Sequence, residues 1–267
     1  MAASTGLITI CKLHETDLAS GPTLVCQHIL ADPVILVLSI AWHPSDPTIL
    51  GFTLSDGRVG VAKVKKASGW SDGTAVEITE LHRHELEAWT LAFDRGDATQ
   101  VMSGGDDSAL RCSSFVDTGG VVPLWKSRKL HEAGVTAILP LTTDLMLTGS
   151  YDDHIRLISH QPSGRPQCLL ECNLGGGVWR LKLLHEDYND ASGFTILASC
   201  MHAGTRVIRL RGDSSEDAGW TIDIIGKFEE HRSMNYGSDV QPGNGSLETI
   251  MSTSFYDKLL CLWQVDT

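Results

Sequence analysis

The chain has 267 residues, 42% hydrophobic and 20% charged, which are ordinary values for a folded globular domain. Asp and Glu number 33 against 21 Lys and Arg, so the formal net charge is −12. A surface of this charge repels nucleic acid phosphates and anionic membranes. The composition therefore excludes a disordered or collagen-like chain, and we expect no nucleic acid or membrane partner.

The cysteine pattern and the N-terminal residues bear on the cellular compartment in which the protein is expected. Seven cysteines, an odd number with no C-x-x-C pair, are typical of reduced and buried thiols. Cys168, Cys172, Cys200 and His202 lack the spacing of a zinc ribbon or finger, so we expect no metal. Residues 1–17 have neither the basic nor the apolar region of a secretory signal. We expect a cytoplasmic protein.

In chain order, the predicted elements are all strands. Two strands, 6–13 and 23–30, come first. Five segments then repeat one pattern of apolar strand, polar turn and second alternating strand: 50–64, 101–115, 145–159, 196–210 and 250–264. Alternation on both sides of a polar turn predicts a β-hairpin.

The five hairpins form an internal repeat. Their turn residues follow one another at intervals of 51, 45, 50 and 55 residues: Asp56, Asp107, Asp152, His202 and Asp257. Shorter strands lead into the hairpins at 39–44, 88–94, 135–141 and 178–184, and others follow at 75–82, 124–131, 168–174 and 221–228. Four strands at this period are typical of a propeller blade.

Histidines mark three of the repeats. His84, His131 and His231 precede their turn aspartates by 23, 21 and 26 residues, and Trp263 lies in the last repeat. This pattern resembles the WD-repeat blade, in which His, Ser or Thr, Asp and Trp form a hydrogen-bonded tetrad. We therefore predict an all-β fold, a WD-repeat β-propeller of about five to six recognisable blades forming a single domain over 1–267.

The strand count leaves the ring incomplete. The strands 6–13 and 23–30 form part of a blade that precedes the first hairpin repeat. Together with four complete blades and three strands of a last blade, they fall short of the seven blades of a full ring. Open edge strands are an aggregation liability. We expect either the C-terminal two-thirds or so of a seven-bladed propeller or a smaller ring.

Two short motifs invite enzymatic interpretations. GWSDG (69–73) matches the G-x-S-x-G nucleophile elbow, but strands on both sides of Ser71 do not supply the helix that the elbow needs. LGGGVWR (174–180) lacks the residues of a P-loop or a dinucleotide loop. Its glycines predict a tight crossing between two blades, after which Trp179 and Arg180 would begin an innermost strand.

Longer strings carry a resemblance to one family. They are HELEAW (84–89), SGGDDSALR (103–111), LTGSYDDHIRL (147–157), GGGVWRLK (175–182), ASCMHAG (198–204) and STSFYDKLLCLW (252–263). Together they resemble the diphthine methylesterase family, WD-repeat proteins of diphthamide synthesis, from about Gly6 to Trp263. The resemblance implies hydrolysis of the methyl ester of methylated diphthine on translation elongation factor 2, without a cofactor, by a monomer.

Four residues are candidates for the chemistry of ester hydrolysis, which needs an activated water or nucleophile. His202 replaces the turn aspartate of its repeat and is our first choice of base. Cys200 is a conceivable nucleophile, although a lone cysteine on an apolar strand also suits a core. His154 is an alternative base, and Glu87 could orient water or attract the substrate's trimethylammonium group.

Aromatic side chains at equivalent blade edges are candidates for binding that cation. They are Trp89, Trp179, Tyr236 and Tyr256, and one aromatic face binds a cation with about 0.5 to 2 kcal/mol. Ordinary packing of inner-strand aromatics explains them equally. Arg180 could bind the ester carbonyl or the partner protein, or form a surface ion pair.

Two other functions stay open at this point. Most WD-repeat folds are interaction scaffolds without catalysis, and a fold alone assigns no chemistry. A truncated propeller that cannot close its ring would be inactive.

Overall fold

The computed structural model describes residues 1–13, 21–65, 69–116, 120–161, 164–187, 193–212, 219–242 and 247–267. These residues form strands and turns, and none of them belongs to a helix long and apolar enough to cross a membrane. The chain divides into two compact units, Met1–Lys129 with Pro162–Arg165, and Leu130–Gln161 with Pro166–Thr267. Each unit is described on its own.

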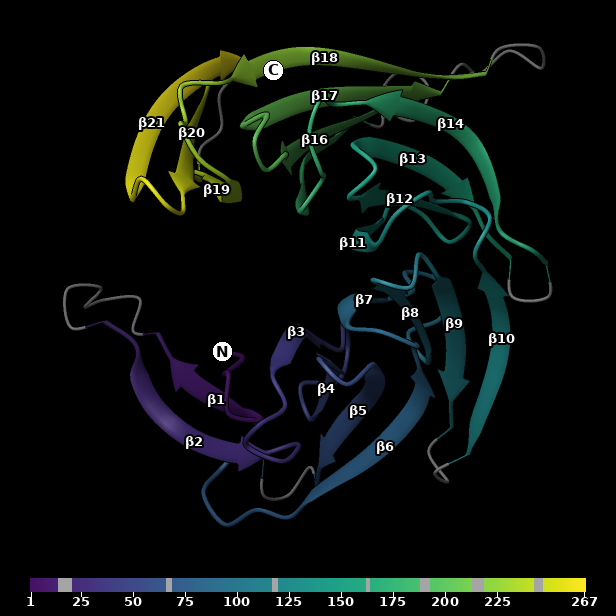
Figure 1. The fold of residues 1–267 in the computed structure, drawn as a ribbon. Coiled ribbons are helices and arrows are strands. Elements are labelled where there is room, and N and C mark those ends of the chain that lie inside the picture. The colour runs from purple at the N-terminus through teal and green to yellow at the C-terminus, as the bar shows by residue number, and fades with distance from the viewer. Residues whose placement is uncertain are drawn as a thin grey trace. The chain divides into compact units, whose positions relative to one another are not determined.

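The first unit contains three antiparallel sheets whose strands pair in chain order (Figure 1). The two-stranded sheet is β1 (Leu7–Lys12) and β2 (Thr23–Ile29). The next sheet is β3 (Val37–Trp42), β4 (Ile49–Leu54), β5 (Arg58–Val64) and β6 (Val76–Arg83). The third is β7 (Ala88–Phe93), β8 (Gln100–Gly105), β9 (Leu110–Phe115) and β10 (Val121–Ser127).

The second unit also contains three antiparallel sheets in chain order. The first is β11 (Val135–Pro140), β12 (Leu145–Ser150), β13 (His154–Ser159) and β14 (Gln167–Asn173). The second is β15 (Arg180–Asp187), β16 (Gly193–Ser199), β17 (Thr205–Gly212) and β18 (Trp220–Phe228). The third is β19 (Asn235–Val240), β20 (Leu247–Ser254) and β21 (Leu259–Asp266).

Apolar side chains hold neighbouring sheets of the second unit together. Leu147 and Leu157 of the first sheet pack in one core with Ile196 and Ile208 of the second. A smaller core around Val207 and Ile250 joins the second sheet to the third. The central strand β16 is buried along its whole length, because it has a sheet on either face. The fourth strands of the two four-stranded sheets, β14 and β18, consist of half-buried and exposed residues.

The sequence prediction of an all-β fold built from four-stranded, blade-like meanders is confirmed. The described residues form 21 strands, in sheets of two, four, four, four, four and three, as the repeat analysis expects. Ser71 lies between β5 and β6, where its hydroxyl contacts Thr74 at 2.6 Å, so the strand–turn–strand context is also confirmed. That all sheets form one propeller domain stays a prediction.

The expected tetrad is complete in neither of its best copies. In the last repeat Ser252 accepts or shares hydrogen bonds with His231 Nε2 at 2.9 Å and Trp263 Nε1 at 3.2 Å, but His231 Nδ1 is buried without a partner. In the second repeat His84 bonds both Asp107 and Ser103, at 2.8 Å each. There His82 Nε2, 2.6 Å from Ser103 Oγ, makes the contact that Trp263 makes in the last repeat.

Burial of His131 makes the stability of the fold depend on pH. The side chain is 5% exposed and its Nε2 lies 2.8 Å from Thr148 Oγ1. Burial, reinforced by Arg156, lowers the pKa of His131 to about 4. Because its folded pKa lies below the unfolded value of 6.5, the unfolded chain binds the extra proton first as the pH falls.

We predict that His131→Gln flattens the acid limb of the stability curve. The free energy of unfolding of the wild type should fall by about 1.4 kcal/mol per pH unit on account of this histidine, between roughly pH 6.5 and pH 4. Urea unfolding at several pH values measures this, and the gap between wild type and variant should narrow on acidification. A gap that is independent of pH would contradict the prediction.

Candidate functional site

Three turn aspartates accept a hydrogen bond from the backbone N–H that lies three residues before the first strand of their own sheet. Asp107 accepts the N–H of Glu85 at 3.1 Å, and Asp152 accepts that of Glu132 at 2.9 Å. Asp257 accepts the N–H of Arg232 at 3.1 Å. These aspartates are structural, since each fixes the entry to its sheet by a hydrogen bond between a carboxylate and a backbone N–H.

The fourth repeat satisfies the same N–H locally. Gly175 N donates to the side chain of Asn173, its second neighbour, at 2.8 Å. The turn residue of this repeat, His202, is thereby released from the task that aspartate performs elsewhere. His202 is exposed, and the structure gives its imidazole no hydrogen-bond partner among the described residues.

The turn aspartate also pairs with a buried arginine in the third repeat, and in the fourth repeat a different residue provides that carboxylate. In the third repeat the buried Arg156 pairs with Asp152 at 2.8 Å and with Glu171 at 3.1 Å. At the equivalent place in the fourth repeat, Arg206 pairs with Glu229 at 2.6 Å. Its guanidinium therefore keeps a carboxylate partner without any help from position 202.

The three glycines of LGGGVWR lie against the turn that carries His202. Gly175 has a φ of +85°, a conformation that favours glycine. A side chain at Gly176 would place its Cβ 2.5 Å from Cys200 O and 2.8 Å from Ala203 Cβ. The predicted role of these glycines as a tight crossing between two sheets is confirmed by Val178 N, which bonds Ser150 O of β12, and by Trp179 N, which bonds Ser199 O of β16.

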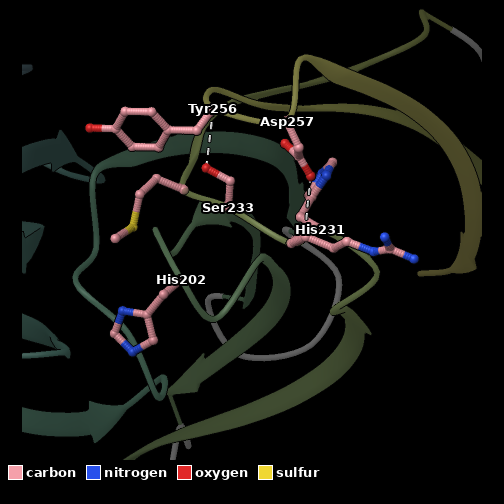
Figure 2. Close-up of a pocket in the computed structure, with 7 residues that line it drawn as sticks. His202, His231, Ser233, Tyr256 and Asp257 are labelled. Carbon is pink, nitrogen blue, oxygen red and sulfur yellow. Dashed lines mark hydrogen bonds between the residues drawn. The ribbon is translucent and has the colours of Figure 1, made fainter.

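A pocket of about 540 Å³ opens beside this turn, where three connections of the second unit meet. Its lining residues are His202, His231, Arg232, Ser233, Met234, Tyr256 and Asp257. Figure 2 shows His202 on one side of the pocket and Ser233 with Tyr256 on the other. Tyr256 N donates to Ser233 Oγ at 3.1 Å, which leaves the hydroxyl proton of Ser233 able to donate.

Five aromatic side chains, here called the aromatic strip, run into this pocket. In order they are Tyr151, Trp179, Tyr236, Phe255 and Tyr256. Successive ring centroids are 5.9, 5.2, 5.9 and 5.0 Å apart, within the range of favourable aromatic pairs. Phe255 and Tyr256 are 64% and 70% exposed. The strip thus offers accessible aromatic faces next to His202.

The protonation states around the pocket are set mainly by burial. Burial, followed by the neighbouring Tyr256, raises the pKa of Tyr236, which therefore stays a neutral phenol. Burial lowers the pKa of His231 despite the nearby Asp257 carboxylate, so this imidazole is neutral at pH 7. The positive charge at the pocket then comes from Arg232.

Arg180 is already engaged with the strip. Its guanidinium carbon lies 4.9 Å from the Trp179 ring centroid, a cation–π arrangement. Its Nη1 also donates to the carbonyl oxygens of Trp179 at 2.9 Å and Thr136 at 3.3 Å. One face of Trp179 is therefore occupied by a cation of the protein itself.

Cys200 and His154, two predicted candidates, lie outside the pocket. Cys200 is fully buried in the core between two sheets, and burial raises the pKa of its thiol to about 12. It is a neutral thiol at pH 7 and a poor nucleophile. His154 is tied to its own turn, with Nδ1 2.6 Å from Asp152 O.

Glu87 and Trp89 belong to the first unit. Trp89 Nε1 donates to Asp106 at 3.1 Å, and the carbonyl of Glu87 accepts the N–H of Asp106 at 2.8 Å. Both side chains are half-buried. Their predicted contact with substrate stays a prediction.

A Ser–His–Asp arrangement in the first unit looks like a hydrolytic triad but lacks access. Asp107, His84 and Ser103 are joined by two hydrogen bonds of 2.8 Å. Burial opposes ionisation of Asp107, yet the hydrogen bonds from His84 and from the Glu85 N–H hold its pKa well below the ordinary value. Ser103 is 0% exposed and its hydroxyl also contacts His82, so no substrate reaches it.

The sequence prediction missed several residues of this region: Tyr151, Phe255, Arg232, Ser233 and Met234. A signal for two of them existed. Tyr151 follows the last residue of β12 and Phe255 follows the last residue of β20, so each is an aromatic residue at the end of the first strand of a predicted hairpin. The others depend on the entry of β19 beside the His202 turn.

The chain is similar to several proteins of known name, although no family model matches it. It is 34% identical over 240 residues to a protein of Schizosaccharomyces pombe named diphthine methyltransferase, with 88% of this chain and 66% of that protein covered. A diphthine methyltransferase homolog of Dictyostelium discoideum is 31% identical, with coverages of 86% and 62%. The human diphthine methyltransferase is 30% identical, with coverages of 90% and 51%. The chain thus spans about half to two thirds of the relatives it matches.

We predict that Gly176→Ala destabilises the second unit. The new methyl group would meet backbone atoms of Cys200 and Ala203 that cannot move independently, at an expected cost of about 1–3 kcal/mol. Gly219→Ala is the control, because nothing lies within 4 Å of a Cβ there. Equal urea unfolding midpoints for the two variants would contradict the close packing of the glycine run.

Proposed function

The chain belongs to the family of the diphthine methyltransferase proteins, and from this premise we propose that it acts in diphthamide synthesis as a methylesterase. The substrate in this proposal is methylated diphthine, a modified histidine on translation elongation factor 2. The observation that carries the proposal is the pocket in which an unpartnered histidine, His202, meets the end of an accessible aromatic strip.

His202 is the base of the proposed reaction. It takes a proton from a water molecule whose oxygen attacks the ester carbonyl carbon, and the C–O bond to the methoxy group then breaks. The proton held by His202 passes to the leaving methoxide, which gives methanol, and the carboxylic acid that remains releases its proton to solvent and becomes a carboxylate. Asn173 accepts the Gly175 N–H and Glu229 pairs with Arg206, so neither interaction requires the side chain of His202, which supports this assignment.

Arg232 and Ser233 are placed to stabilise the negative oxygen of the tetrahedral intermediate. Both line the pocket with His202, and both can donate hydrogen bonds. Donors directed at a developing oxyanion are among the largest contributions to ester hydrolysis. We assign them this role.

The aromatic strip is the proposed binding surface for the trimethylammonium group. Arg180 covers one face of Trp179, so we assign the cation to Tyr236, Phe255 and Tyr256, whose faces carry no such charge. Arg180 is then left to bind a carbonyl oxygen of the substrate protein.

The names of these relatives denote methyl transfer, whereas we propose that water accepts the acyl group. The two reactions differ in their products, since hydrolysis releases methanol and restores a carboxylate, and transfer consumes a methyl donor. The combination of a free imidazole and hydrogen-bond donors supports water activation.

We also propose a cytoplasmic protein that works as a monomer without a cofactor. The seven cysteines are all free, which suits a reducing compartment. Elongation factor 2 is the proposed protein partner.

We predict that His202→Ala lowers methanol release from methylated elongation factor 2 by about 10²- to 10⁴-fold, the usual contribution of a general base. His154→Gln, the competing base, is the matched comparison and should retain turnover. Methanol is measured enzymatically, and mass spectrometry follows the loss of the methyl group from the factor. Loss of turnover in His154→Gln with normal turnover in His202→Ala would reverse the assignment. Binding without any methanol release by the wild type would favour a scaffold.

A further inference from the structure

Asn235 interrupts a pattern that the other repeats share. It is the first residue of β19, and the equivalent first residues of β3, β7 and β11 are Val37, Ala88 and Val135. These are apolar and almost fully buried, as expected for a core position. A polar residue here is not needed to build a sheet of this kind, so its presence asks for another explanation.

The amide of Asn235 is 0% exposed and fully satisfied. Its Nδ2 donates to Thr253 O at 2.8 Å and to Gly237 O at 3.1 Å. Its Oδ1 accepts from Thr205 Oγ1 and Ser238 Oγ, both at 3.2 Å. All four hydrogen-bonding positions of the amide are in use, which fixes its orientation.

The backbone of Asn235 forms two hydrogen bonds with Met201, in the turn that carries His202. Its N–H donates to Met201 O at 2.9 Å, and its carbonyl accepts the N–H of Met201 at 3.2 Å. Met201 has a φ of +43°, a left-handed conformation that is strained for a residue with a side chain. Such strain persists only where the surroundings hold it.

The side chain of Asn235 forms a hydrogen bond at the other end of the turn, with Thr205. Thr205 follows Gly204 directly and opens β17, so the bond from Thr205 Oγ1 to Asn235 Oδ1 fixes the exit of the turn. The turn is therefore held before and after His202 by one residue. The next residue of β19, Tyr236, belongs to the aromatic strip.

We propose that Asn235 is a positioning residue that sets the His202 imidazole relative to the aromatic strip. The claim that this matters for catalysis rests on the proposed function, whereas the claim that it fixes His202 does not. Asn235 itself lies beneath the surface and touches no substrate.

Asn235→Val tests the proposal, because valine occupies the equivalent position in β3 and β11 and suits the sheet. The control is Thr148→Val, which removes a hydrogen bond from an equally buried polar residue, to His131, away from the His202 turn. Asn235→Asp adds a conservative comparison that keeps Oδ1 as an acceptor for Thr205.

The first readout needs no activity. In the full chain, NMR of the His202 imidazole should give one narrow signal in the wild type and in Thr148→Val, and a shifted or broadened one in Asn235→Val, with partial recovery in Asn235→Asp. An unchanged His202 signal in a folded Asn235→Val protein would overturn the proposal.

The second readout is methanol release from methylated elongation factor 2. Misplacement of a reacting group costs up to about 100-fold in rate, so kcat should fall by roughly 10- to 100-fold in Asn235→Val with little change in KM. An equal fall in Thr148→Val would show a general loss of rigidity and overturn the positioning role. If the His202 signal changes but the wild type releases no methanol, the positioning role stands and the proposed function fails.

Discussion

The structure depends on an acceptor for one backbone N–H at the entry to five of the six described sheets. Three repeats use the aspartate in a later turn of the same sheet, between β8 and β9, β12 and β13, or β20 and β21, and there a change of the turn residue removes the acceptor. Before two other sheets the acceptor is a side chain two residues earlier in the chain: Asn173 accepts the N–H of Gly175, and Asp32 accepts the N–H of Val34. Only where the acceptor is local is the turn residue free to vary, and His202 stands at such a turn.

The remaining features of the fourth repeat follow from that freedom. Without a tetrad histidine to accommodate, the glycine run can lie close to the turn, with Gly176 against Cys200 and Ala203. Arg206 turns to Glu229 instead of a turn aspartate. The cost of a left-handed Met201 is met by its pairing with Asn235. The repeat that departs furthest from the common pattern is thus the one that presents an exposed imidazole to a pocket.

Much of the fold could be predicted from local pattern alone. The hairpin predicted over 145–159 agrees with β12 and β13, because alternation and a polar turn are properties of adjacent residues. His202 could be selected because it breaks a repeat. The roles of Asn173 and Asn235 could not, since they depend on which backbone groups lack partners. The neighbours in the strip, such as Tyr151 and Trp179, are separated in sequence, and only the pairing of whole sheets brings them together.

The chemistry proposed for the site follows from two kinds of group placed side by side. Aromatic faces attract a quaternary ammonium group without hydrogen bonds, and the pocket supplies an imidazole with Arg232 and Ser233 for an ester. A structure of the chain bound to a peptide carrying methylated diphthine tests this most directly. The ester should lie in the pocket next to His202, with the trimethylammonium group over Tyr236, Phe255 or Tyr256. An ester bound away from His202, for instance at Glu87 and Trp89 of the first unit, would contradict it.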